Sequence, residues 1–370
     1  MPVLSFAPAL SFLAVFQRVS PVRPLRTLFQ TANDKLRPSR LLPYTPLHRR
    51  AQNEVLASGQ AGPHQLSTLL RESGKGRTPT IVLGGFVPDS SEQIFLLRRF
   101  FLRRGDLYGI NYAPNGFSLD LLCAQLDDLV EELNRHGQPP VIFSVSFGSG
   151  LVMEWLRRTR LAGRTPGVAG IVLVSPVACV ADLISPSAPK PTTLLGRALR
   201  PYLDSAAAVK DEIVERSRVI FTRMFESGAQ NKESLNALMS PGELSRLHSA
   251  VMGTIRSINA AGACERVQAM RAMTSPADYL SGGILPLTTA PALVLFAEKE
   301  DSVLDSGSPT RFALENAHRS FFPDSCVQVV STKEGSPVQH ASLIFHVSDF
   351  RPPITAFYQR VKHRRLKSAA

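Results

Sequence analysis

The sequence of 370 residues is poor in cysteine and lacks the clusters that hold metals or phosphates. Its four cysteines are widely scattered, with no C-x-x-C pair and no Cys/His group at metal-ligand spacing (Cys123, Cys179, Cys264 and Cys326). This spacing argues against a disulfide framework or a zinc site and favours reduced, mostly buried thiols. The run LGGF at 83–86 contains two glycines but lacks the G-x-G-x-x-G spacing of a dinucleotide site. We therefore expect no metal and no organic cofactor.

Long apolar runs are also missing. Residues 3–16 are largely apolar, but they are shorter than the roughly 20 residues of a membrane-spanning helix and Pro8 interrupts them. No basic segment precedes this run and no A-x-A-like cleavage site follows it. The segment is interpreted as a targeting tail or as an arm that contacts an anionic membrane surface. The expected location is cytoplasmic, with membrane association or N-terminal targeting also open.

The middle of the chain carries no net charge, although the whole sequence has a net charge of +12. Residues 1–60 contribute +6 and residues 351–370 another +6, so residues 61–350 are balanced. A nucleic-acid-binding domain would spread its basic excess over the folded surface, so no nucleic-acid partner is expected. Residues 1–60 are predicted to be a basic, proline-rich and poorly ordered arm. The basic termini suggest a weak contact with membrane surfaces, and the oligomeric state stays open.

From residue 78 onward, short apolar runs alternate with stretches of helical periodicity. A buried strand has a continuous β-branched and apolar run, whereas an amphipathic helix repeats its apolar residues every three to four positions. This rhythm predicts an α/β fold, in which helices cover both faces of a mostly parallel sheet. The expected strands are Thr80–Leu83, Leu107–Asn111, Pro140–Val145 and Gly170–Val174, and the expected helices are 91–103, 119–135 with Ser118 as its N-cap, and 149–162.

The junction between a strand and a helix at 144–150 carries the strongest chemical signal. A nucleophile at this position needs small residues two places before and two places after it, because the chain turns sharply there. Ser144 and Gly148 meet this need around Ser146, in a G-x-S-x-G pattern whose first glycine is replaced by serine. The start of the following helix would stabilise negative charge nearby. The competing interpretation is a tight turn of small residues with no chemistry.

This junction is one of several features by which the chain, from about residue 78 to its end, resembles the α/β-hydrolase superfamily. The run IVLGGF at 81–86 is similar to the family's first core strand and its oxyanion loop, with Gly84 where a histidine is usual. The resemblance implies that the backbone N–H groups of Phe86 and Phe147 form the oxyanion hole. A serine nucleophile, in place of aspartate, argues against the dehalogenase and epoxide-hydrolase branches.

The resemblance also implies a carboxylate and a histidine that follow two late strands. After PALVLF (291–296) comes a turn in which Asp301 is the expected triad acid, with Glu300, Asp305 and Asp182 as further candidates. After CVQVVS (326–331) comes His340, the expected general base, whereas His346 is interpreted as a core histidine. The chain order of nucleophile, acid and histidine agrees with this fold.

These residues together predict a Ser-His-Asp triad that cleaves a carboxylic ester or thioester through an acyl-enzyme. The small-molecule substrate is expected to carry an apolar acyl chain. Two competing functions stay open. The first is an acyltransferase that uses the same triad, and the second is a non-catalytic binding protein with this fold.

A long insertion is predicted to cover the site. Residues 183–288 interrupt the sheet, begin with a proline-rich linker and continue through helical stretches near 194–226, 231–238 and 242–273. They are expected to form a helical cap, with 61–182 and 289–370 as the hydrolase core. An apolar acyl pocket is expected between cap and core, because ligand sites favour such junctions.

Overall fold

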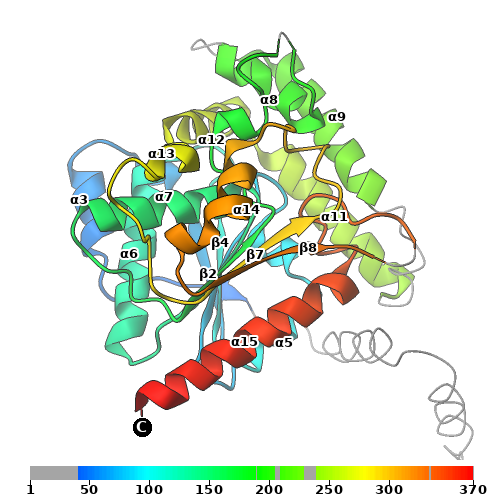
Figure 1. Cartoon of the computed structure of the whole chain (residues 1–370). Coiled ribbons are helices and arrows are strands. Elements are labelled where there is room, and N and C mark those ends of the chain that lie inside the picture. The colour runs from blue at the N-terminus through cyan, green and yellow to red at the C-terminus, as the bar shows by residue number, and fades with distance from the viewer. Residues whose placement is uncertain (1–40, 189, 205–208, 229–238, 333–334, 370) are drawn as a thin grey trace, which may run out of the picture.

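The computed structural model describes residues 41–369 except 189, 205–208, 229–238 and 333–334 (Figure 1). Its centre is an eight-stranded sheet in the order β1-β2-β4-β3-β5-β6-β7-β8. The strands from β3 to β8 are parallel, and β1 and β2 add an antiparallel edge. The predicted α/β fold with a mostly parallel sheet is confirmed. The strands are β1 (Leu42–Pro43), β2 (Thr68–Glu72), β3 (Thr80–Leu83), β4 (Leu107–Asn111), β5 (Val141–Val145), β6 (Gly170–Val174), β7 (Ala292–Ala297) and β8 (Ser325–Val330).

The central strands are apolar along their whole length because helices cover both faces of the sheet. Every residue of β3, β5, β6 and β7 is buried. Alternate residues of one strand enter different apolar clusters: Ile81 and Leu83 lie in one, and Val82 between them lies in the other. This two-sided burial explains why the strands have continuous apolar sequences and no polar alternation.

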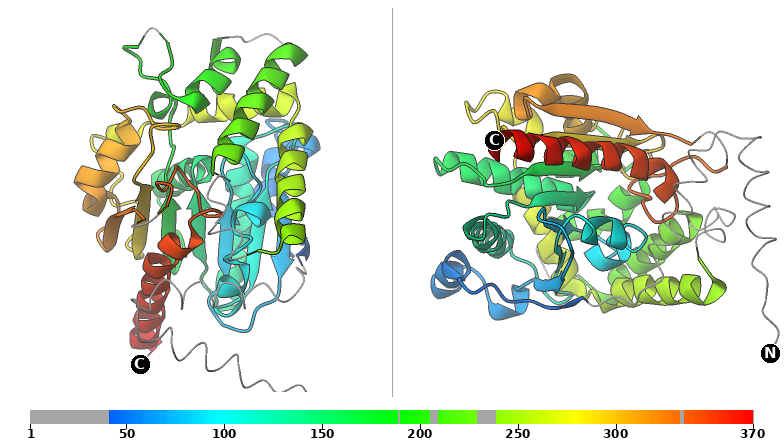
Figure 2. Two further views of the ribbon diagram at one scale, coloured as in Figure 1. Left: turned by 90° about the vertical axis from the view of Figure 1, so that its right-hand side faces the viewer. Right: turned by 90° about the horizontal axis from the view of Figure 1, so that it is seen from below.

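Each face of the sheet has its own set of helices (Figures 1 and 2). The helices α6 (Leu119–Arg135), α7 (Phe147–Leu161) and α14 (Pro309–Phe321) contribute apolar side chains to the first cluster. The helices α5 (Arg98–Leu102) and α15 (Val347–Ala369) contribute to the second cluster. The predicted N-cap of α6 is confirmed, since the Ser118 hydroxyl accepts a hydrogen bond from the N–H of Leu121 at 3.2 Å.

Two sequence expectations about local structure are wrong. The expected helix over 91–103 is divided into α4 (Ser90–Gln93) and α5, with Ile94, Leu96 and Leu97 buried in the turns between them. The expected disordered arm over 1–60 ends earlier, because β1 pairs with β2 and α3 (Arg50–Ala57) packs on α6. The rest of that arm, residues 1–40, lies outside the described residues.

Helix α3 is held by acidic side chains of α6. The Asp128 carboxylate accepts hydrogen bonds from two N–H groups of the first turn of α3, those of Ala51 and Gln52, both at 3.0 Å. The Tyr44 hydroxyl donates to Glu132, whose other oxygen accepts from the N–H of Leu47 at 2.6 Å. Asp128 satisfies donors that the start of α3 leaves free, and Glu132 holds the segment before it, so the described sequence after residue 40 is fixed to the core.

The insertion between β6 and β7 is helical and lies beyond the carboxyl ends of the strands (Figure 1). The helix predicted near 231–238 falls outside the described residues. Within the described part of the chain, no helix has the length and apolar character needed to cross a bilayer. The helices of the insertion are α8 (Leu194–Asp204), α9 (Asp211–Gly228), α11 (Pro241–Ser257), α12 (Ala260–Ala272) and α13 (Pro276–Tyr279), and the 3-10 turn η2 (Val180–Asp182) precedes them.

Candidate active site

Ser146 lies at a sharp turn between β5 and α7. Its backbone has φ 51° and ψ −120°, a conformation that residues with a Cβ rarely adopt. The N–H of Ser146 donates to the carbonyl of Val174 on the neighbouring strand at 2.8 Å, which holds the turn in this conformation. Strain of this kind persists only where surrounding structure enforces it, and it is concentrated at functional sites. The turn directs the hydroxyl of Ser146 out of the sheet at the start of a helix.

The small neighbours of Ser146 are required by close backbone contacts. A Cβ on Gly148 would lie 2.3 Å from the carbonyl oxygen of Gly84, so no side chain fits at this position. Ser144 stands where glycine is usual in the pattern, and its buried hydroxyl donates to the carbonyl of Val172 at 3.1 Å. The steric requirement is therefore clear at Gly148, and at Ser144 a hydrogen bond satisfies the buried hydroxyl.

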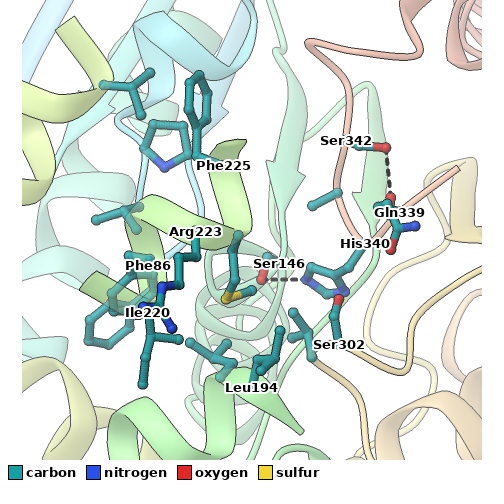
Figure 3. A pocket seen from close by; sticks show the side chains of 18 of the residues that line it. Phe86, Ser146, Leu194, Ile220, Arg223, Phe225, Ser302, Gln339, His340 and Ser342 are labelled. Carbon is teal, nitrogen blue, oxygen red and sulfur yellow. Dashed lines mark hydrogen bonds between the residues drawn. The ribbon is translucent and has the colours of Figure 1, made fainter. Parts of the chain in front are cut away.

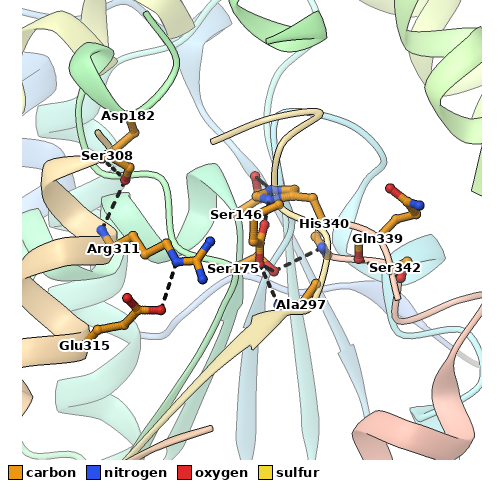
Figure 4. A network of polar contacts seen from close by, with 12 residues as sticks. Ser146, Ser175, Asp182, Ala297, Ser308, Arg311, Glu315, Gln339, His340 and Ser342 are labelled. Atoms are coloured by element: carbon orange, nitrogen blue, oxygen red, sulfur yellow. Dashed lines mark hydrogen bonds and ion pairs between the residues drawn. The ribbon is translucent and has the colours of Figure 1, made fainter. Parts of the chain in front are cut away.

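His340 connects Ser146 to a buried carboxylate. Its Nε2 lies 2.9 Å from the hydroxyl oxygen of Ser146, and its Nδ1 forms a hydrogen bond with Oε2 of Glu300 (Figures 3 and 4). The side chain of His340 is 6% exposed and that of Glu300 is 1% exposed. With the proton on Nδ1 facing Glu300, Nε2 is left as the acceptor for the serine hydroxyl proton. The structure therefore brings together two of the three residues expected from the sequence.

The prediction that Asp301 is the triad acid is wrong. Its side chain is exposed, and Glu300 makes the contact with His340. Glu300 turns inward because Oε1 accepts hydrogen bonds from the N–H of Ala297 at 2.7 Å and from the hydroxyl of Ser175 at 2.8 Å. Its own carbonyl accepts from the next turn of the chain, which fixes its backbone. The prediction thus differs from the structure by one position: Glu300 is buried, and its neighbour Asp301 is exposed.

The remaining candidate acids, Asp182 and Asp305, have structural partners away from His340. Asp182 is fully buried and accepts five hydrogen bonds, from the N–H groups of Ala178, Cys179 and Thr310 and from the hydroxyls of Ser308 and Thr310 (Figure 4). It ties η2 to the start of α14. Asp305 accepts from the hydroxyl of Thr192 at 2.7 Å and from the N–H of Gly307 at 3.0 Å. Neither carboxylate contacts the histidine.

His346 is buried, and both of its ring nitrogens have partners. Nδ1 lies 3.0 Å from the hydroxyl of Ser342, and Nε2 lies 3.0 Å from the carbonyl of Ser336. Both contacts are internal to the loop and helix start that follow β8. This is the environment of a core histidine, as the sequence context suggests.

The two N–H groups expected to bind an oxyanion have no acceptor among the described residues. These are the backbone amides of Phe86 and of Phe147, the first residue of α7. The loop that carries Phe86 approaches the serine closely, because a Cβ on Gly85 would lie 3.4 Å from the Cβ of Ser146. The side-chain oxygen of Gln93 accepts from the N–H of Gly85 at 2.9 Å and holds this loop in place. Free donors beside a hydroxyl can stabilise a negatively charged oxygen.

A buried arginine of the insertion contacts the same loop. Arg266 on α12 is 2% exposed and donates to the carbonyls of Phe86 at 2.8 Å, Tyr112 at 3.3 Å and Ala113 at 3.1 Å. Burial lowers the pKa of this guanidinium to about 10, although the nearby Asp89 carboxylate opposes the shift. The group therefore stays charged at neutral pH and connects the insertion to the loop beside Ser146.

A cavity of about 580 Å³ opens beside Ser146 and His340 between the insertion and the sheet (Figure 3). This volume lies within the range of roughly 300–1,000 Å³ that is usual for small-molecule sites. Its walls are mainly apolar, so the cavity suits a hydrocarbon group. The apolar side chains come from the loop after β3, from α8, α9 and α11, and from the segment before α15: Phe86, Val87, Leu194, Leu195, Ile220, Phe221, Met224, Phe225, Val251, Ile255, Ile344 and Phe345.

The carboxylate of Glu92 on α4 contacts helix α11 of the insertion. Glu92 accepts from the hydroxyl of Thr254 on α11 at 2.8 Å, and burial raises its pKa from 4.5 to about 7. An acid whose pKa is raised by folding is neutral more often in the folded state than in the unfolded state. Its contribution to stability is therefore complete below about pH 4.5 and is lost as the pH rises through about 7.

We expect Glu92→Gln to stabilise the protein at high pH only. Glutamine keeps the shape and cannot ionise, so the free energy of unfolding should rise by about 1–2 kcal/mol near pH 8.5 and change little near pH 5. Denaturant unfolding at both pH values measures this. Glu226→Gln, which replaces an exposed glutamate of α9, is the control. An equal gain at both pH values would contradict the assignment of the effect to ionisation of Glu92.

Sequence reasoning missed three residues that support this site: Ser175, Gln93 and Arg266. Ser175 had a usable signal, because it directly follows β6 and the carboxyl ends of neighbouring parallel strands lie at one edge of the sheet. Gln93 and Arg266 had none, since each acts through a contact that only the tertiary fold creates. Within the described residues, no group of three His, Cys, Asp or Glu side chains is placed to hold a metal ion.

The comparisons with known proteins add the fold and no function. No protein-family model matches the sequence, and no curated protein matches it. Among solved structures, a thermophilic esterase from Thermogutta terrifontis matches with a TM-score of 0.53 and 14% identity, over 87% of this chain and 99% of that one. A bacterial membrane phospholipase A matches with a TM-score of 0.52 and 13% identity, over 96% of this chain and 97% of that one.

An epoxide hydrolase from Bacillus megaterium is similar to the same degree, with a TM-score of 0.52 and 10% identity, over 79% of this chain and 97% of that one. The chain therefore has the α/β-hydrolase fold, as its sequence motifs suggest. Because these three neighbours bear the names of different activities, the fold alone does not select a reaction. The reaction must therefore be inferred from the residues at the end of β5 and around it.

Proposed function

We propose that this protein is a serine hydrolase that cleaves a carboxylic ester or thioester through Ser146, His340 and Glu300. The observation that carries the proposal is the chain of contacts from the Ser146 hydroxyl, 2.9 Å from Nε2 of His340, through the imidazole to the buried Glu300. A serine hydroxyl is a poor nucleophile at its ordinary pKa, and an oriented imidazole is the usual means of activating it.

In the first half of the reaction, the Ser146 oxygen attacks the acyl carbon while Nε2 of His340 takes the hydroxyl proton. Glu300 remains ionised, holds the imidazole in the required tautomer and stabilises the imidazolium that forms. The negative charge on the former carbonyl oxygen is bound by the N–H groups of Phe86 and Phe147, each of which lowers the barrier by about 3 kcal/mol. His340 then donates its proton to the leaving alcohol or thiol as the acyl–oxygen or acyl–sulfur bond breaks.

In the second half, water attacks the acyl-enzyme while His340 accepts a proton from it. The acid product leaves, and the proton returns to Ser146. The cavity supports an apolar acyl group, because apolar side chains form most of its walls. The insertion above it would act as a lid, since its helices α8, α9 and α11 supply much of the wall.

We expect a fluorophosphonate probe with an alkyl chain to label the folded protein at Ser146 and at no other serine. Such probes react only with a serine that a neighbouring base activates and whose product oxyanion is bound. Mass spectrometry of the labelled peptide identifies the residue. The buried Ser149 on α7, whose hydroxyl has no hydrogen-bond partner among the described residues, serves as an internal control. A folded protein that takes up no probe would overturn the proposed function.

A further inference from the structure

The walls of the cavity contain two arginines that the triad does not use. Arg197 comes from α8 and Arg223 from α9, and both residues are exposed and line the cavity. In Figure 3, Arg223 extends from α9 into the cavity and lies on the side of Ser146 opposite to His340. Both arginines belong to the insertion, so this feature is separate from the catalytic residues, which belong to the sheet and its loops.

Among the described residues, no acidic side chain of the cavity lining balances these two charges. None of the described residues in its lining is Asp or Glu. Arg223 makes no hydrogen bond or ion pair with any described residue, and among these residues the guanidinium of Arg197 donates only to the carbonyl of Thr192, at 3.1 Å. Several other arginines form ion pairs with carboxylates, as Arg157 and Arg158 do with Glu154.

Unpaired guanidinium groups beside an apolar cavity favour a ligand that is both apolar and anionic. An arginine offers planar donors that match a carboxylate or a phosphate in pairs. Its charge acts more strongly at a partly enclosed, low-dielectric surface than in open water. A neutral ester would leave both cations without a partner, and a cationic ester would be repelled by them.

We propose that the substrate is an amphiphilic ester that carries an anionic group, a phosphate or a carboxylate, bound by Arg223 and Arg197. This inference rests on the proposed function, which it makes more specific. The apolar acyl chain lies against the walls from α9 and α11, the ester carbonyl lies at Ser146, and the anionic group faces the two arginines. The arginines select the substrate and take no part in the proton transfers.

Two matched pairs of esters test this selection. The phosphate pair is 1-octanoylglycerol 3-phosphate and 1-octanoylglycerol, and the carboxylate pair is 4-(octanoyloxy)benzoate and its methyl ester. In each pair the scissile bond and the acyl chain are the same, so the ratio of the two kcat/KM values reports on the anion. Comparing this ratio between variants cancels the intrinsic reactivity of the esters, and comparing the pairs distinguishes phosphate from carboxylate.

We expect the wild type to favour the anionic member of at least one pair by about tenfold or more at low salt, which corresponds to about 1.4 kcal/mol. The preference should shrink near 1 M salt, where the Debye length is about 3 Å. In the double variant Arg197→Gln, Arg223→Gln the ratio should fall by about tenfold or more relative to the wild type. Arg216→Gln, which removes the same charge from an exposed site on α9 outside the cavity, should keep the preference.

The outcomes separate this proposal from the proposed function. Hydrolysis of neutral esters with no preference in either pair, or a preference that survives in the double variant, overturns the anion site and leaves the hydrolase. If no ester is hydrolysed, binding of octyl phosphate by calorimetry decides. Binding by the wild type that the double variant loses supports the site without the reaction, whereas no binding, or equal binding by both, overturns it.

Discussion

Replacing Ser146 by alanine is expected to lower kcat for an octanoyl ester by about 10⁵-fold or more, to the residual rate that binding and oxyanion donors alone supply. The substitution removes the only atom that forms the acyl-enzyme and leaves His340 with no hydroxyl proton to accept. A matched variant, Ser149→Ala, changes another buried serine on α7 and should keep the activity within a few-fold. The initial rate of ester hydrolysis measures both variants. A Ser146→Ala protein that keeps more than about one hundredth of the rate would contradict a serine mechanism.

The same position should reveal the strain of the turn. At φ 51° and ψ −120° a Cβ is unfavourable, so Ser146→Gly should be more stable than Ser146→Ala by about 1 kcal/mol. At an ordinary exposed helical position the order is the reverse, with alanine more stable than glycine by about 1 kcal/mol. Ser249, exposed in the middle of α11, provides that control. Denaturant unfolding of the four variants gives the comparison, and the same order at both positions would contradict strain at Ser146.

The parts of this molecule that the sequence predicts are those fixed by local chemistry. The strands from β3 to β7 could be predicted from continuous apolar runs. Both faces of these strands are buried, so polar and apolar residues do not alternate along them. Ser146 follows from a steric rule about its neighbours, and the contact between Gly148 and the carbonyl of Gly84 is the physical basis of that rule. His340 was predicted from the resemblance, because α/β-hydrolases place their histidine in the loop after the last strand, and this loop follows β8 here.

The parts that the sequence did not predict depend on which side of a loop faces the core. Glu300 and Asp301 are adjacent carboxylic acids, and the N–H of Ala297 and the hydroxyl of Ser175 hold Glu300 as the buried one. Arg266 contacts carbonyls that are about 150 and 180 positions away along the chain. Carbonyl acceptors have no sequence signature, because every residue has one. Such contacts become visible only when the fold is known.

The assignment of the acid therefore yields the sharpest test of this site. We expect Glu300→Gln to lower kcat by about 10³–10⁴-fold and Asp301→Asn to leave it within a few-fold. Glutamine keeps the shape of Glu300 but loses the charge that stabilises the imidazolium, and its amide can present a donor to Nδ1 and favour the wrong tautomer. The Asp301→Asn substitution changes an exposed side chain that makes no described contact with His340. Both substitutions remove one negative charge from the same loop, so each controls for the other.

A third variant separates the charge of Glu300 from its position. Ser175→Ala removes one of the two donors to Oε1 while the carboxylate stays ionised, so kcat should fall by only about tenfold, the effect of one hydrogen bond to a charged group. The Ser175 hydroxyl donates to Glu300 and also accepts from the N–H of Ala341, the neighbour of His340, at 3.1 Å. Because both contacts position the same pair of His340 and Glu300, the loss of Ser175 should have a smaller effect in the Glu300→Gln background, and the double variant should be non-additive. Additive losses would mean that Ser175 supports the site by another route. If Asp301→Asn instead lowered kcat as much as Glu300→Gln, Asp301 would be restored as the acid. The loop after β7 would then have to rearrange when substrate binds, so that Asp301 replaces Glu300 beside His340.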